Sequence, residues 1–130
     1  MITTNDICEM TGVAPSTLTE WVTAGVITPV VAGGPGRGNS RRFTSMSAVG
    51  IAVAVALAKS ERGCAPAYVG AVVEAFAAVT GAWLREKFAK GDTHFFAIHQ
   101  GKPLLTDPRP YELVNVEAIY EQFHAKAVVA

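Results

Sequence analysis

Basic side chains gather in one part of the chain, and that part contains no acid. Residues 21–60 hold four basic residues and no Asp or Glu. The four are Arg37, Arg41, Arg42 and Lys59. An arginine guanidinium presents several N–H donors in one plane and pairs well with phosphate oxygens. Over the whole chain 11 bases balance 11 acids. The excess is therefore local and predicts a surface for a phosphate-bearing partner.

Two short helices joined by a tight turn are expected ahead of this basic stretch. Thr3 and Asp6 have the spacing of a capping box, and Gly12 is placed to end the first helix. Pro15 suits the first position of a second helix, which ends near Gly25. This pattern predicts a helix-turn-helix unit.

A β-hairpin wing is expected next. Residues 30–31 predict a short strand, residues 32–40 a tip rich in Gly and Pro, and residues 41–43 the returning strand. Thr44 is placed as the N-cap of a helix over residues 45–59. A wing beside a helix-turn-helix unit is the arrangement of a winged-helix head.

The middle of the chain is strongly apolar. Residues 48–58 contain no charged side chain, and residues 68–84 contain a single one, Glu74. A helix over residues 66–89 is expected, with Gly81 as its weak point. Helices that are apolar on every side must be buried, and a winged head with a small hairpin leaves them partly uncovered in one chain. We therefore expect a homodimer formed through these helices.

The C-terminal part predicts two strands and a helix. The strands are expected over residues 94–100 and 111–114, with a turn at residues 101–102. Asn115 is placed to cap the last helix. The hydrophobic residues of this part either line a ligand pocket or form the core of a β-β-α cap. The short segment favours the cap.

An ordered series of residues links the helix-turn-helix unit to the wing. It consists of Gly12, Val13, Ala14, Pro15, Ser16, Thr17, Leu18, Trp21, Gly25, Val26, Ile27, Pro29, Arg41, Arg42, Phe43 and Thr44. Residues 61–65 continue the series. Over about half the chain, it resembles the DNA-binding head of the MerR family, the mercury-resistance-type regulators, and of their excisionase-like relatives. The resemblance implies a dimeric winged-helix regulator that bends or untwists double-stranded DNA.

The resemblance also implies a set of DNA-binding residues. Residues 15–24 would form the helix that enters the major groove. The contacts would come from Ser16, Thr17, Thr19 and Glu20, exposed on that helix, and from Arg37, Arg41 and Arg42 on the wing. Short hydroxyls can bond to phosphates or bases, and a Glu carboxylate can accept from a cytosine amino group. The arginines would neutralise phosphates.

Two positions depart from the family pattern. Thr19 and Glu20 stand where the family has Arg followed by Tyr, and Ala14 replaces the usual capping Ser. DNA binding is therefore expected to depend more on the wing and on dimerisation. Trp21 is the aromatic residue that excisionase-like relatives favour, although a large aromatic on a short helix usually anchors that helix in a core.

The sequence predicts no enzyme, no metal and no cofactor. The Gly-rich tip lacks the GxxxxGK[ST] pattern of a phosphate loop. His94 and His99 are an odd number of residues apart, so a regular strand would place them on opposite faces. Cys8 and Cys64 have no partner at ligand spacing, which indicates a reduced, cytoplasmic protein. No apolar run approaches the about 20 residues of a membrane helix, so no membrane partner is expected.

The expected fold class is mainly α with a small β component. With 130 residues, 50% of them hydrophobic and 17% charged, the chain can fold compactly and is not a disordered chain. A winged helix-turn-helix DNA-binding head is expected over residues 1–62. A helical dimerisation segment follows over residues 63–91. A β-β-α cap or small effector segment occupies residues 92–130.

The function that this organisation predicts is sequence-specific binding of double-stranded DNA by a homodimeric transcriptional regulator of MerR-like type. Two alternatives stay open. One is an excisionase-like architectural factor that bends DNA. The other is a protein-interaction module that kept the winged-helix fold without DNA binding, which Thr19 and Glu20 would allow. No residue pattern supports a small-molecule effector.

Overall fold

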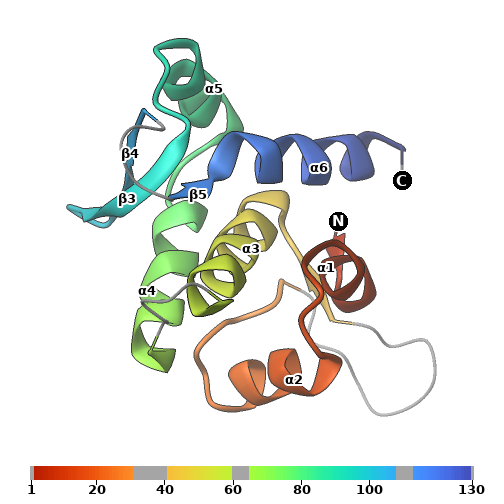
Figure 1. The fold of residues 1–130 in the computed structure, drawn as a ribbon. Helices are drawn as coiled ribbons and strands as arrows, with labels where there is room; N and C mark the ends of the chain where they lie inside the picture. The colour runs from red at the N-terminus through yellow and green to blue at the C-terminus, as the bar shows by residue number, and fades with distance from the viewer. Residues whose placement is uncertain (1, 31–40, 60–64, 108–112, 130) are drawn as a thin grey trace.

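The computed structural model describes residues 2–30, 41–59, 65–107 and 113–129 (Figure 1). The helices are α1 (Thr4–Thr11), α2 (Pro15–Thr23), α3 (Ser45–Lys59), α4 (Pro66–Ala77), α5 (Gly81–Ala89) and α6 (Val116–Val129). The strands are β1 (Ile2–Thr3), β2 (Arg42–Phe43), β3 (His94–His99), β4 (Lys102–Thr106) and β5 (Val114–Asn115). The predicted fold class, mainly α with a small β component, is confirmed.

Helix α3 occupies the centre of the molecule, where it contacts α1, α4 and α6 (Figure 1). Residues 48–55 of α3 are all buried. The predicted N-cap is confirmed, because the Ser47 amide donates to Thr44 Oγ1 at 3.1 Å. A helix without a polar stripe is stable in water only when neighbours cover its whole circumference. The apolar composition of α3 therefore follows from its central position.

A single chain buries residues 48–55 of α3, whereas one face of α4, which includes Ala67, Tyr68 and Ala71, stays exposed. One hydrophobic core runs from Phe43 in the head through Phe76 of α4 to Phe123 of α6. The prediction allowed only a winged head and a small hairpin as cover. It did not foresee that α6 packs across α3 and that α3 packs against α4 (Figure 1). The premise of the homodimer prediction therefore fails for α3 and holds for one face of α4.

Helices α3 and α4 approach each other closely at Gly50. A Cβ atom built on Gly50 would lie only 2.9 Å from the Cα atom of Val73 and 3.2 Å from the Cβ atom of Phe76. Because glycine has no side chain, the backbone of α4 can settle directly against α3. This contact fixes the distance between the two most apolar helices.

The predicted helix over residues 66–89 is wrong, because it forms two helices, α4 and α5. Helix α4 ends at Ala77, and α5 begins after Thr80. The Thr80 Oγ1 atom accepts a hydrogen bond from the Trp83 amide at 3.1 Å. An oxygen that satisfies the first amides of a new helix favours a break over continuation of the old helix. Gly81, the expected weak point, is the first residue of α5.

The C-terminal sheet has three antiparallel strands in the order β4-β3-β5. Gln100 and Gly101 form the tight turn between β3 and β4, with φ angles of 51° and 74°. Strand β4 was not predicted, since Pro103 argues against a central strand, but an edge strand tolerates proline. The returning strand predicted over residues 111–114 is β5, which starts at Val114; residues 111–112 lie outside the described residues.

Helix α6 begins as predicted, and one of its faces is buried. The Ala118 amide donates to Asn115 Oδ1 at 3.0 Å, which confirms the N-cap. Val116, Tyr120 and Phe123 are buried. Their spacing turns one face of α6 toward the core.

No helix within the described ranges has, by itself, both the length and the apolar composition to cross a bilayer. Helices α4 and α5 would reach that length only as a pair, and their axes differ by 90°.

Candidate nucleic-acid interface

The first two helices are joined by a tight turn, as predicted. The Asp6 amide donates to Thr3 Oγ1 at 3.2 Å, and the Thr3 amide donates to Asp6 Oδ2 at 3.0 Å, which completes the capping box. Helix α1 ends at Gly12, whose φ of 75° is left-handed and suits glycine. Pro15 then opens α2. These local signals fix where α2 starts relative to α1.

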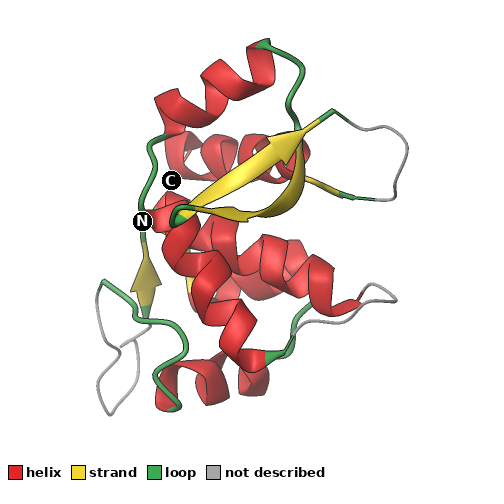
Figure 2. Cartoon of the chain, turned by 90° about the vertical axis from the view of Figure 1, so that its left-hand side faces the viewer, coloured by secondary structure: helices red, strands yellow, loops and turns green. Residues whose placement is uncertain are grey.

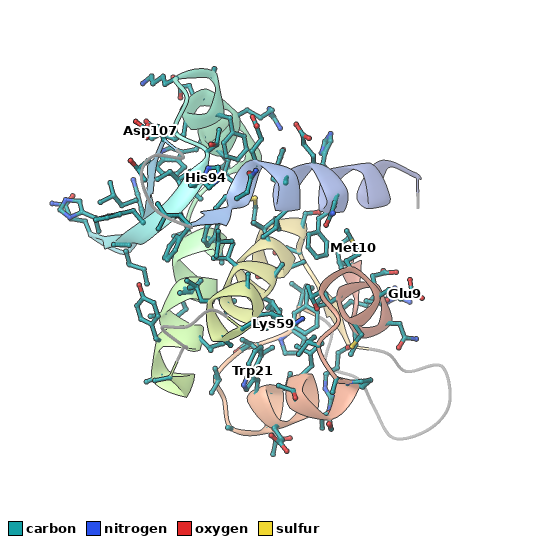
Figure 3. All side chains as sticks on the ribbon, in the orientation of Figure 1. Glu9, Met10, Trp21, Lys59, His94 and Asp107 are labelled. Atoms are coloured by element: carbon teal, nitrogen blue, oxygen red, sulfur yellow. The ribbon has the colours of Figure 1, made fainter. Side chains whose placement is uncertain are left out.

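Helix α2 has one face in the core and one in solvent. Leu18 is buried, and Trp21 packs against the same core, on the side of α2 that faces α3 in Figure 3. The exposed members of the predicted set are Ser16, Thr19 and Glu20. Thr17 was predicted to be exposed but is half-buried. It lies one helical turn before Trp21 and therefore on the same flank.

The returning strand of the predicted wing is β2, and its partner is the N-terminus. Ile2 pairs with Phe43 and Thr3 pairs with Arg42, in antiparallel register. This pairing was not predicted, because its only signal in the sequence is two β-branched residues, Ile2 and the helix cap Thr3. Val30, predicted to begin a strand, lies in none, although its amide donates to the Arg42 carbonyl at 2.8 Å.

Arg41 reaches from the base of the predicted wing to the exposed face of α2. Its Nη1 atom lies 3.4 Å from Thr19 Oγ1. The Arg41 carbonyl accepts a hydrogen bond from the Thr4 amide at 3.3 Å, so its backbone is held against the start of α1. A guanidinium has five N–H donors, and the Thr19 hydroxyl occupies one of them. The side chain therefore keeps donors for a further acceptor beside α2.

The other predicted cations occupy different positions. Arg42 is exposed and follows Arg41 directly. Arg37 and the Gly-rich tip lie outside the described residues. Lys59 belongs to another site, because its Nζ atom donates to the Thr11 carbonyl at 2.7 Å and caps the C-terminal end of α1 (Figure 3). Two arginines and the carboxylate of Glu20 thus set the charge of the described interface.

The histidines offer no support for a metal site. His94 lies at the start of β3, where its Nδ1 atom is 2.7 Å from Thr93 Oγ1. A β-bulge between Phe95 and Ala97 interrupts the alternation behind the prediction that His94 and His99 face opposite sides. Within the ranges that the structure describes, no three His, Cys, Asp or Glu side chains gather as metal ligands.

Of the two cysteines, Cys8 lies among the residues that the structure describes. Cys8 is half-buried in α1 as a free thiol. Burial raises the pKa of this thiol above its ordinary value. Cys64 lies outside the described residues.

The interface that emerges is a polar helix face with two adjacent arginines at its edge. It lies at the end of the molecule formed by α2, below α3 in Figure 1. Comparison of the chain with protein-family models, with curated proteins and with solved structures gave no match.

Proposed function

We propose that the protein is a sequence-specific, double-stranded-DNA-binding transcriptional regulator of MerR-like type, which acts as a homodimer in the cytoplasm. The observation that carries the proposal is the contact between Arg41 and Thr19, 3.4 Å long. It joins the base of the wing to the exposed face of α2. A groove-reading helix with a cation at its edge needs this combination.

Helix α2 has the surface of a helix that reads the major groove. Leu18 holds the inner face of α2 in the core, so the helix cannot turn about its own axis. Ser16 and Thr19 present hydroxyls that can bond to phosphate oxygens or base edges. Glu20 would accept a hydrogen bond from the amino group of a cytosine.

Arg41 supplies the positive charge that α2 itself lacks. The family pattern has a basic and an aromatic residue where this chain has Thr19 and Glu20. Because Arg41 directly precedes β2 and its Nη1 atom contacts Thr19, a guanidinium stands at the edge of the reading helix all the same. It offsets the repulsion between Glu20 and the phosphate backbone. Arg42 and Arg37 would add phosphate contacts along the wing.

A homodimer is proposed because one head carries few cations for binding DNA. Each phosphate contact adds only modestly to affinity, and non-specific binding typically has a Kd of about 10⁻⁴ to 10⁻⁶ M. Two heads on successive major grooves, about 34 Å apart, would combine their contacts on a pseudo-palindromic site. Light scattering after size exclusion at micromolar concentration checks this part. A stable monomer, both free and bound to DNA, would contradict it.

The experiment that tests the function is selection from a pool of random duplexes. The expected result is an enriched inverted repeat, because two heads related by a twofold axis read the same half-site twice. The double variant Arg41→Ala, Arg42→Ala should lose the enrichment. The control Lys90→Ala should retain it, since Lys90 is an exposed cation directly after α5, the helix at the end of the molecule opposite α2 in Figure 1. Absence of any enriched sequence would contradict the proposal.

Enrichment of direct repeats with cooperative loading would instead favour an excisionase-like architectural factor. Such a factor coats DNA as a row of copies rather than as one closed dimer. The same pool therefore separates the two modes of DNA binding.

A protein-interaction module is the second candidate, and Glu20 favours it. This carboxylate is exposed on the face of α2 that would meet DNA. Near phosphates it is repelled unless it reads a base. An interaction module would show no salt-dependent retention on DNA, and the loss of Arg41 and Arg42 would leave its behaviour on DNA unchanged.

A further inference from the structure

An open pocket of about 240 Å³ lies between α5 and the β3–β4 hairpin. Helix α5 lies at the end of the molecule opposite α2, as both Figure 1 and Figure 2 show. The apolar lining of the pocket includes the indole of Trp83, Pro103 and Leu105. Leu104 also lines it and is 42% exposed. The pocket therefore offers an aromatic surface and aliphatic side chains to a ligand.

The polar lining of the pocket is mostly cationic. Lys87, Lys102 and His99 contribute basic groups, against the single carboxylate of Asp92. The Lys87 Nζ atom lies 5.0 Å from the centre of the Trp83 ring, a cation–π contact. Two ammonium groups and the imidazole of His99 face one carboxylate. Such a cleft concentrates anions.

We propose that this pocket binds a small aromatic carboxylate. The ring would lie against Trp83 and Leu104, and the carboxylate would pair with Lys87 and Lys102. Size agrees with this class, since a cavity of about 150 Å³ holds one benzene molecule. The additional space accommodates a carboxyl group. An inorganic anion would satisfy the lysines but leave the apolar lining without a partner. The site is independent of the proposed DNA interface, so either can fail without the other.

Trp83 makes the binding directly observable. Titration of the full chain with benzoate should change the tryptophan emission in a saturable way. The change should persist in Trp21→Phe and disappear in Trp83→Phe, because only Trp83 lines the pocket. Benzamide, which keeps the ring without the charge, and acetate, which keeps the charge without the ring, should bind more weakly. Calorimetry on the unaltered chain gives the same comparison if Trp21→Phe does not fold.

Two lysine variants and a matched control test the charge recognition. Lys87→Met and Lys102→Met should each weaken benzoate binding by about threefold to tenfold, the range for loss of one partly exposed charge pair. Lys90→Met should leave the Kd unchanged, because Lys90 is exposed beyond the end of α5 and does not line the pocket. Three results would overturn the proposal. The first is no saturable signal up to about 10 mM benzoate, a concentration far above ordinary ligand affinities. The second is that benzamide binds as tightly as benzoate. The third is that Lys90→Met and Lys87→Met change the Kd equally.

Discussion

Among single residues, Glu20 and Arg41 carry the balance of charge at the proposed interface. In the proposed complex with DNA, Glu20 would lower affinity for any sequence and, if it reads a cytosine, would raise affinity for the right one. Arg41 would raise affinity for all sequences, because phosphates carry no base information. Replacing Glu20 is therefore expected to change specific and non-specific affinity in opposite directions, and replacing Arg41 to lower both.

Replacing Glu20 separates these roles. Glu20→Gln should strengthen binding to random duplex by a few-fold at low salt, because a repulsive charge is lost. It should weaken discrimination at the contacted base pair by about 1 kcal/mol or more. Equilibrium titrations with the selected and the random duplex measure both effects. Glu86→Gln on α5 is the matched control, since Glu86 is exposed and distant from α2. Equal changes in both variants would show that Glu20 does not meet DNA.

Cys8 makes a prediction about pH. Burial raises the pKa of its thiol in the folded chain, so the neutral form persists to higher pH than in the unfolded chain. The folded state therefore holds the proton more tightly, and it loses stability as pH rises above the ordinary cysteine value. In a Cys64→Ser background, iodoacetamide at pH 8 should modify the native protein more slowly than the urea-unfolded chain. Equal rates would show that Cys8 is not protected.

The residues of the candidate site could be predicted only in part from the sequence. The exposure of Ser16 and Glu20 follows from helix periodicity around Leu18. The contact between Arg41 and Thr19 joins residues 22 positions apart. It depends on how β2 sits against the head, which no local pattern encodes.

At the scale of elements, helix boundaries marked by capping residues were predictable, and pairings between distant segments were not. Thr3, Thr44 and Asn115 each cap the helix expected of them. The pairing of β1 with β2 was missed because strands of two residues leave no periodic signal. Strand β4 was missed because Pro103 is acceptable only at a sheet edge, a position that topology decides.

For a substitution at Gly50, the contact of α3 with α4 and the helix propensity predict changes in stability of opposite sign. Propensity alone would make Gly50→Ala stabilising by up to about 1 kcal/mol. The added methyl group would instead lie 2.9 Å from the backbone of Val73. We expect the free energy of unfolding to fall by about 1–3 kcal/mol, the usual effect of overpacking. Urea denaturation followed by circular dichroism decides the sign, and an increase in stability would refute the close contact.

At the scale of the whole molecule, one continuous core joins the head to the C-terminal part. It includes Ile2 and Leu18 near the N-terminus and Phe123 near the C-terminus. Segments that share a core are expected to unfold together. The apolar composition of α3 is thus explained by intramolecular packing, and the sequence could not reveal this because composition does not show which segment covers which.

Two tryptophans, one in α2 and one in α5, test whether the head and the C-terminal part unfold together. Trp21 reports on the head, and Trp83 reports on the part around α5 (Figure 1). Trp83→Phe and Trp21→Phe each leave one tryptophan. For each variant, circular dichroism measures the urea concentration at the midpoint of global unfolding. The fluorescence midpoint of each variant in urea should coincide with its own global midpoint. A tryptophan transition well separated from the global one would mean that head and C-terminal part fold independently.

The central claim, that the α2 face with Arg41 binds DNA, is tested most directly by the salt dependence of binding to the selected duplex. The logarithm of the binding constant should fall linearly with the logarithm of salt concentration. Arg41→Ala should reduce the slope by about two for a dimer, close to one for each head, and Lys90→Ala should leave it unchanged. Binding that is insensitive to salt, or an Arg41→Ala slope equal to that of Lys90→Ala, would contradict the claim.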